Sequence, residues 1–167
     1  MRRSLDLELQ GRGRHSLYRW LALGVLALIV LAALLGVFGQ QSTTTVAAGS
    51  GAVLRVEAPA HLRGGLLFQA RFEIHAQRRL AHPRLVLSSG WFESMTQNTL
   101  VPMPLSENSG PEGLSMSFEE VPAGHTLIVW SEWQVNPTNV GRRSEDVALF
   151  DGLTRIASVE RTLTVLP

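Results

Sequence analysis

The side chains best suited to metal binding or proton transfer are scattered along this sequence. Its five histidines, His15, His61, His75, His82 and His125, show neither HxH nor HExxH spacing. Two adjacent carboxylate pairs occur, Glu119-Glu120 and Glu145-Asp146. Neighbouring side chains on an extended chain point to opposite sides, so these pairs suit solvated turns better than acid/base catalysis. No DxDxDG calcium loop is present, and the sequence predicts no metal or cofactor.

The serines offer no recognisable nucleophile. Ser50, Ser89 and Ser115 all lack the GxSxG context in which a hydrolase presents its catalytic serine. The interpretation as a non-enzyme is therefore favoured, with a cell-envelope hydrolase of an unrecognised type as the alternative. An enzyme should show a concave pocket with convergent polar groups, whereas a binding module should show a flat apolar patch.

Two loops contain residues that could contact a partner. Trp91 and Phe92 begin a long connection, residues 89–112, in which residues 99–101 are expected to form a short edge strand. Burial of both aromatic side chains on the core is the favoured interpretation there. Residues 136–143 form a turn-rich loop that ends in Arg142 and Arg143, which could bind a carboxylate or phosphate. A solvated loop is favoured over such a site.

A third candidate surface lies on the expected strand 125–135. Alternation places Leu127, Val129, Ser131, Trp133 and Val135 on one face, which should be core. The opposite face leaves Ile128 and Trp130 as an apolar pair among polar neighbours. Either residues 89–112 cover this pair, which is slightly favoured, or the pair is an open partner-binding patch.

These candidates belong to a chain organised around one apolar segment. Residues 20–38 contain no ionisable side chain, and 19 helical residues span roughly 28 Å, close to a ~30 Å bilayer core. Residues 1–19 have five arginines against two acidic residues, whereas residues 39–52 have no charge. The positive-inside rule therefore predicts a single-pass plasma-membrane protein with a cytoplasmic basic tail and an extracytoplasmic C-terminal part.

A cleaved signal peptide is the competing interpretation, and it would give a secreted domain. The apolar run exceeds the ~7–15 residues of a typical h-region. The nearest small-residue cleavage candidate, Val46-Ala47-Ala48, also lies well beyond the run. A retained anchor that contacts the lipid bilayer is therefore favoured. Ala32 and Gly36 form one small-xxx-small pair, which frequently arises by chance, so a homodimer is not favoured.

The remaining chain is expected to form one all-β domain. Residues 39–52, rich in Gln, Ser, Thr, Ala and Gly, read as a flexible linker. Residues 53–167 contain about seven stretches with period-two alternation, separated by Gly and Pro turns. The expected strands are residues 53–58, 68–76, 84–88, 114–119, 125–135, 147–150 and 156–166. Asp151-Gly152 is a strong hairpin-turn signal between the last two.

The C-terminal third resembles bacterial immunoglobulin-like domains on membrane-anchored or adhesive proteins. The resemblance is carried by VPAGHTLIVWSEWQV, by the DG turn and by the final strand RTLTVLP. It implies an immunoglobulin-like β-sandwich with a binding or interaction role. The chain has no cysteine, so the disulfide of antibody-type domains is absent.

Charge and composition limit the classes of partner. Residues 20–167 carry ten arginines against twelve acidic residues, a balance of −2 that argues against nucleic-acid binding. The expected function is therefore an anchored binding, structural or accessory module of a membrane or cell-envelope assembly, with a protein partner.

Overall fold

The structure, a computed structural model, describes the backbone of residues 3–35 and 40–167 and the side chains of residues 16–35 and 40–167. Helix α1 (Arg3–Leu34) is the N-terminal element. Its part from Ser16 to Leu34, with a mean hydropathy of 2.2, is long and apolar enough to cross a membrane or to serve as a signal sequence. The end of the expected span, residues 36–38, lies outside the described residues.

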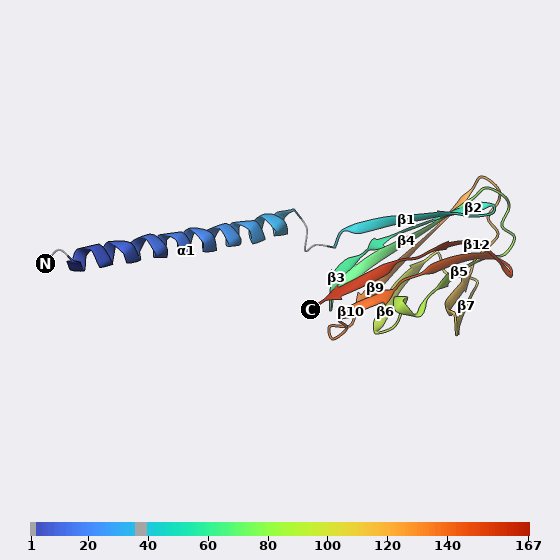
Figure 1. Ribbon diagram of the computed structural model, residues 1–167. Coiled ribbons are helices and arrows are strands. Elements are labelled where there is room, and N and C mark those ends of the chain that lie inside the picture. Colours follow the sequence, from blue (N-terminus) through green and yellow to red (C-terminus); the bar gives the residue numbers. More distant parts are fainter. Residues whose placement is uncertain (1–2, 36–39) are drawn as a thin grey trace. The chain divides into compact units, whose positions relative to one another are not determined.

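Residues 40–167 form a compact unit of two five-stranded sheets and a small end sheet. The first sheet has the order β1(Ser42–Ala48)-β2(Ala52–Pro59)-β4(Leu67–Ala76)-β9(Thr126–Val135)-β6(Met95–Val101), and all of its pairs are antiparallel. The long strands β1, β2 and β4 run side by side in Figure 1. The first sheet supplies one layer of a β-sandwich.

The second sheet supplies the other layer. Its order is β12(Thr154–Val159)-β11(Val147–Asp151)-β5(Pro83–Leu87)-β8(Gly113–Ser117)-β7(Ser106–Gly110). The end sheet has the order β10(Gly141–Ser144)-β13(Thr162–Leu166)-β3(His61–Arg63), and β13 pairs with β3 in parallel. A short 3₁₀ helix, η1 (Ser89–Trp91), precedes β6. The β-sandwich class is thus as expected, although the described residues contain thirteen strands where about seven were expected.

The core lies between the two large sheets because their strands alternate apolar residues, which point inward, with residues that point outward. In β4, Phe68, Ala70, Phe72 and Ile74 are buried while the intervening residues are exposed or half-buried. In β9, Val129, Ser131, Trp133 and Val135 are buried and Leu127 packs against the core. The predicted facing of both strands is confirmed.

The interpretation of residues 39–52 as a flexible linker is wrong for residues 42–48, and residue 39 lies outside the described residues. Residues 42–48 form β1, and its seven residues pair with β2 from Ser42↔Pro59 to Ala48↔Val53. The run Thr43–Val46 consists of β-branched residues, which fit a pleated strand well. Ala47 packs against the core, so the sandwich begins before residue 53. The composition resembled that of a linker because an edge strand with one exposed face needs few large apolar residues.

Candidate interaction surface

The outer face of the first sheet brings together an exposed tryptophan and a network of charges. Strand register places Arg71 of β4, Trp130 of β9 and Val101 of β6 in one row. Trp130 is 46% exposed and Val101 is 55% exposed, although Trp130 is not on an edge strand. An exposed tryptophan within a sheet is unusual, since its large apolar surface gains most from burial.

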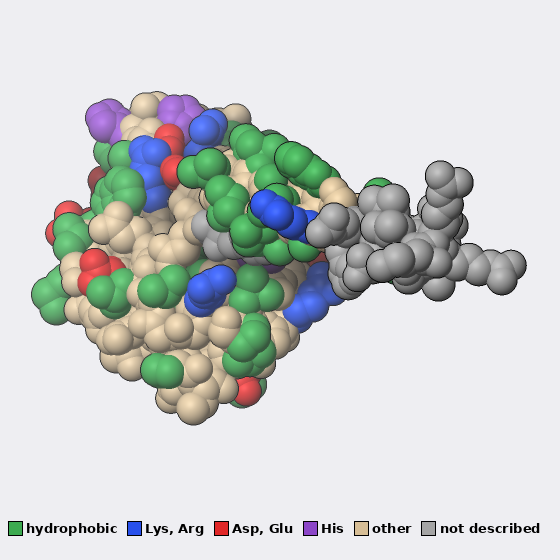
Figure 2. All heavy atoms as spheres, turned by 90° about the vertical axis from the view of Figure 1, so that its left-hand side faces the viewer, with side chains coloured by type: hydrophobic (Ala, Val, Ile, Leu, Met, Phe, Trp, Pro, Cys, Tyr) green, Lys and Arg blue, Asp and Glu red, His purple; other side chains and the backbone are tan. Residues whose placement is uncertain are grey.

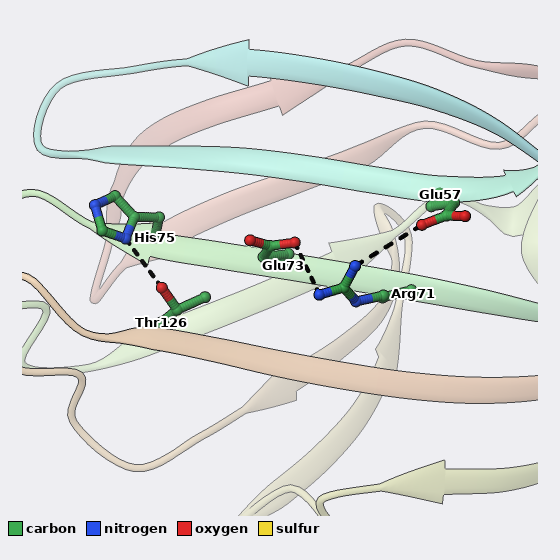
Figure 3. Close-up of polar contacts among 5 residues, drawn as sticks. All are labelled: Glu57, Arg71, Glu73, His75 and Thr126. Atoms are coloured by element: carbon green, nitrogen blue, oxygen red, sulfur yellow. Dashed lines mark hydrogen bonds and ion pairs between the residues drawn. The ribbon is translucent and has the colours of Figure 1, made fainter.

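Polar side chains hold the arginine beside this tryptophan. The Arg71 guanidinium carbon lies 5.4 Å from the centre of the Trp130 ring, within range of a cation–π interaction. The same guanidinium lies 3.1 Å from a Glu73 carboxylate oxygen and 3.9 Å from one of Glu57 (Figure 3). Glu57 of β2 and Glu73 of β4 therefore orient Arg71, while Trp130 remains partly open to solvent.

Two further residues extend this face along β9. Ile128 lies opposite Glu73 and is half-buried. His75 Nδ1 lies 2.9 Å from the hydroxyl of Thr126, as Figure 3 shows. His75 is exposed, as expected for a solvated histidine. We define the outer-face patch as Arg71, Val101, Ile128 and Trp130.

Trp91 and Phe92 do not belong to this patch. Trp91 is fully buried, and its ring centre lies 5.2 Å from that of Phe72 and 6.0 Å from that of Trp133. Phe92 is half-buried against the core. The favoured interpretation, that both aromatics pack on the core, is confirmed, but their place in the candidate partner surface is not supported because Trp91 cannot reach a partner.

A glycine permits this burial of Trp91. A Cβ added to Gly90 would lie 1.8 Å from the carbonyl oxygen of Ser144, so η1 can approach β10 closely only with glycine there. The expected cover over Ile128 and Trp130 does not form either. Residues 89–112 instead contribute β6, which pairs alongside β9 and leaves Trp130 exposed.

The expected loop 136–143 ends in β10, so Arg142 and Arg143 lie on a strand that pairs with β13. Arg142 is exposed, whereas Arg143 is half-buried. Arg143 donates a hydrogen bond of 2.7 Å to the Glu93 carbonyl and another to the Asn139 side chain. These bonds fasten β10 to the residues that follow η1 and to the turn before it. Arg143 therefore stabilises the fold through these hydrogen bonds, and of the two arginines only Arg142 is exposed enough to contact a partner.

Two buried ionisable residues, Glu145 and Arg161, were missed by the sequence reasoning. Glu145 is fully buried, so the expectation of a solvated turn at Glu145-Asp146 is wrong. Neither of its carboxylate oxygens has a hydrogen-bond partner among the described residues. Arg161 is 7% exposed and donates to the Ala58 carbonyl at 2.7 Å and to the Thr43 hydroxyl at 3.4 Å. Arg161 thus links β1 and β2 to the segment between β12 and β13.

Burial dominates the electrostatics of this pair. It raises the pKa of Glu145 from 4.5 to about 8, against the opposing effect of Arg161 and then Arg143. It also lowers the pKa of Arg161, although Glu145 opposes that shift. Alternation could have revealed both residues, because Glu145 shares a face with Val147 and Arg161 shares one with Leu163, and both of these are buried.

No single charge dominates the part of the domain surface visible in Figure 2. Basic, acidic and hydrophobic side chains are interspersed there among neutral ones. This pattern agrees with the charge balance of residues 20–167 and gives no sign of a nucleic-acid-binding surface on that face.

Comparisons with known proteins find similarity to solved structures alone. No protein-family model and no curated protein matches the chain. Among solved structures, the chain is similar to a non-cellulosomal cohesin from the hyperthermophilic archaeon Archaeoglobus fulgidus, with 12% identity and a TM-score of 0.44 over 75% of this chain and 92% of that one. It is also similar to CaCohA2 from Clostridium acetobutylicum, with 13% identity and a TM-score of 0.40 over 78% of this chain and 94% of the other.

Proposed function

We propose that this chain is a single-pass membrane protein whose extracytoplasmic β-sandwich binds a protein partner through the outer-face patch. The observation that carries the proposal is the 46% exposure of Trp130, a residue of an interior strand, beside the exposed Val101. Arg71 and its two carboxylate partners give this apolar centre a polar border. A tryptophan surrounded by oriented polar groups is typical of the residues that dominate binding energy at protein interfaces.

The position of β1 favours a retained anchor over a cleaved signal peptide. The cleavage candidate Val46-Ala47-Ala48 lies within β1, which pairs along its whole length with β2. Cleavage after Ala48 would remove β1, together with the Thr43 hydroxyl that Arg161 contacts. An edge of β2 would then be exposed, which is unfavourable for an extracytoplasmic domain. Retention of residues 1–48 keeps the sandwich whole and keeps it joined to α1.

The alternative of an envelope hydrolase has less support. Catalytic acids and bases need a shifted pKa and access to substrate. Among the described residues, the carboxylate with a strongly raised pKa is Glu145, and it is fully buried beneath the surface. Its unpartnered oxygens therefore face protein and cannot meet a substrate.

The topology of the proposal predicts the location of the C-terminus. Alkaline phosphatase fused after Pro167 is expected to be active, because five arginines precede the apolar segment and no charge follows it closely. A cytoplasmic reporter such as β-galactosidase, fused at the same position, is expected to be inactive. The reverse pattern would refute the proposed orientation.

Photo-crosslinking tests the proposed binding role. A photoreactive phenylalanine derivative replaces Trp130 in the full chain, which is then irradiated in membranes of the native host. As a matched control, the same derivative replaces Leu153, which is 94% exposed in the turn between β11 and β12. We expect a discrete adduct from position 130 and none from position 153. Equal adducts from both positions, or none from position 130, would contradict the proposal.

A further inference from the structure

An apolar groove continues from the outer-face patch around the edge of the sandwich. Resting on the proposed function, we infer that this groove binds an extended segment of the partner in which a large apolar side chain lies next to an arginine or lysine. The groove has a volume of about 440 Å³. Its lining includes the apolar residues Pro102, Met103, Leu105, Phe118, Val121 and Leu127.

The groove lies next to the outer-face patch because of the path of the chain. Pro102 follows Val101, the cross-strand neighbour of Trp130, and Leu127 precedes Ile128 on β9. The chain then crosses from the first sheet to the second, where the Leu105 amide donates to the Ser117 carbonyl at 2.8 Å. A partner seated on Trp130 can therefore extend a segment into the groove.

The walls of the groove differ sharply in exposure. Phe118 and Val121 are each 5% exposed and form a floor that belongs to the core. Met103 is 87% exposed and Leu105 is 68% exposed, so they form an open apolar lip. Both residues belong to the one segment that crosses between the sheets. If they covered a bound apolar group, their apolar surface would be removed from water, which is favourable. Methionine is well suited to such a lip because its flexible side chain adapts to the occupant.

The rim of the groove is acidic, and this determines the charge of the occupant. Glu119 and Glu120 both line it, while none of its lining residues is an arginine. Glu120 is already paired with Arg79, whereas Glu119 has no ion pair among the described residues. On the other side of Met103, a second groove of about 190 Å³ contains Glu107. A cationic side chain beside the apolar anchor would therefore meet Glu119 in this groove, and Glu107 adds a negative charge to the neighbouring one.

Methionine methyl NMR provides a direct readout of binding. The chain has four methionines, of which Met103 lies on the lip, Met95 is half-buried and Met116 is fully buried. The full chain, with ¹³C-labelled methionine methyl groups, is placed in phosphatidylcholine nanodiscs. The probe is an eight-residue capped peptide in which two leucines alternate with two arginines. One control peptide has glutamate in place of arginine, and the other has serine in place of leucine.

We expect the leucine–arginine peptide to shift the Met103 methyl signal in a saturable manner and to leave that of Met116 unchanged. Leu105→Ser should weaken binding by about tenfold through loss of apolar contact. Glu119→Gln should weaken it by about threefold at low salt, and this difference should shrink at high salt. Leu153→Ser, a change at an even more exposed leucine away from the groove, should leave the affinity unchanged.

Three outcomes would overturn the inference. The first is an unchanged Met103 signal with every peptide, and the second is equal binding of the glutamate control. The third is a concentration-dependent Met103 shift without peptide, which would identify a second copy of the chain as the occupant. If any of these occurs while the crosslink from position 130 persists, the groove assignment fails and the proposed function survives. Loss of the crosslink from position 130 would remove the proposed function itself.

Discussion

Trp133→Ala is expected to remove most of the stability of the sandwich. Trp133 is 1% exposed, and its ring centre lies 6.0 Å from that of Trp91, which in turn contacts Phe72. Truncation of a buried tryptophan costs roughly 3–5 kcal/mol because contacts are lost and a cavity remains. A domain of this size has a total stability of about 5–15 kcal/mol. The variant should therefore lose a large fraction of the stability of the domain.

The measurement is the urea midpoint of the full chain in detergent, followed by pulse proteolysis. Trp133→Phe is the matched control, since it keeps an aromatic ring in the cluster and should lose less stability than the alanine variant. Trp130→Ala should lose less than about 1.5 kcal/mol, as expected for a partly exposed side chain. If Trp130→Ala unfolds the domain while Trp133→Ala does not, the assignment of the two faces of β9 is inverted.

Glu145→Gln is expected to stabilise the protein at alkaline pH. The folded state holds the Glu145 pKa at about 8, above its ordinary value of 4.5, because the carboxyl group is buried. Its contribution to stability is therefore fully present below pH 4.5 and is lost as pH rises through 8. At ~1.36 kcal/mol per pKa unit, the loss across this window is on the order of 4 kcal/mol. Glutamine has the shape of the neutral acid and does not ionise.

Urea unfolding of both chains at pH 5 and at pH 8 tests this linkage. The unaltered chain should be less stable at pH 8 than at pH 5, and Glu145→Gln should remove most of that difference. Asp146→Asn serves as the control at the adjacent carboxylate. The half-buried Asp146 side chain accepts a hydrogen bond of 3.0 Å from the Arg161 backbone amide. If Glu145→Gln instead destabilises the protein equally at both pH values, Glu145 is ionised and its attraction to Arg161 stabilises the fold.

Alternation predicted the parts of the sandwich in which it was complete. In β4 and β9 the pattern runs over most of the strand, and both faces were assigned as the structure has them. The hairpin at Asp151-Gly152 was also predicted, since β11 and β12 pair across it. β3 and β10 were missed because three or four residues contain too few alternations to be recognised. β7 was missed because all five of its residues are exposed and none is a large apolar residue.

Features that depend on contacts between distant segments could not be predicted. β1 resembles a linker in composition, and only its pairing with β2 makes it a strand. The burial of Trp91 was the favoured interpretation, but the close approach of η1 to β10 that permits it could not be predicted. The burial of Glu145 agrees with its alternation with the buried Val147, but it was missed because a carboxylate is rarely buried. In β1 and at η1, tertiary packing decided what local sequence left open.

The central claim is that Trp130 mediates partner binding, and recovery of the partner with the full chain tests it most directly. Trp130→Ala and Leu153→Ala are expressed at equal levels of folded protein in native membranes, and each chain is affinity-purified. The amount of the partner that the crosslink from position 130 has identified is then quantified in each preparation. We predict that Trp130→Ala lowers recovery by about tenfold or more, as expected for an interface hot spot, and that Leu153→Ala leaves it unchanged. Recovery with Trp130→Ala within about twofold of the unaltered chain would contradict the account.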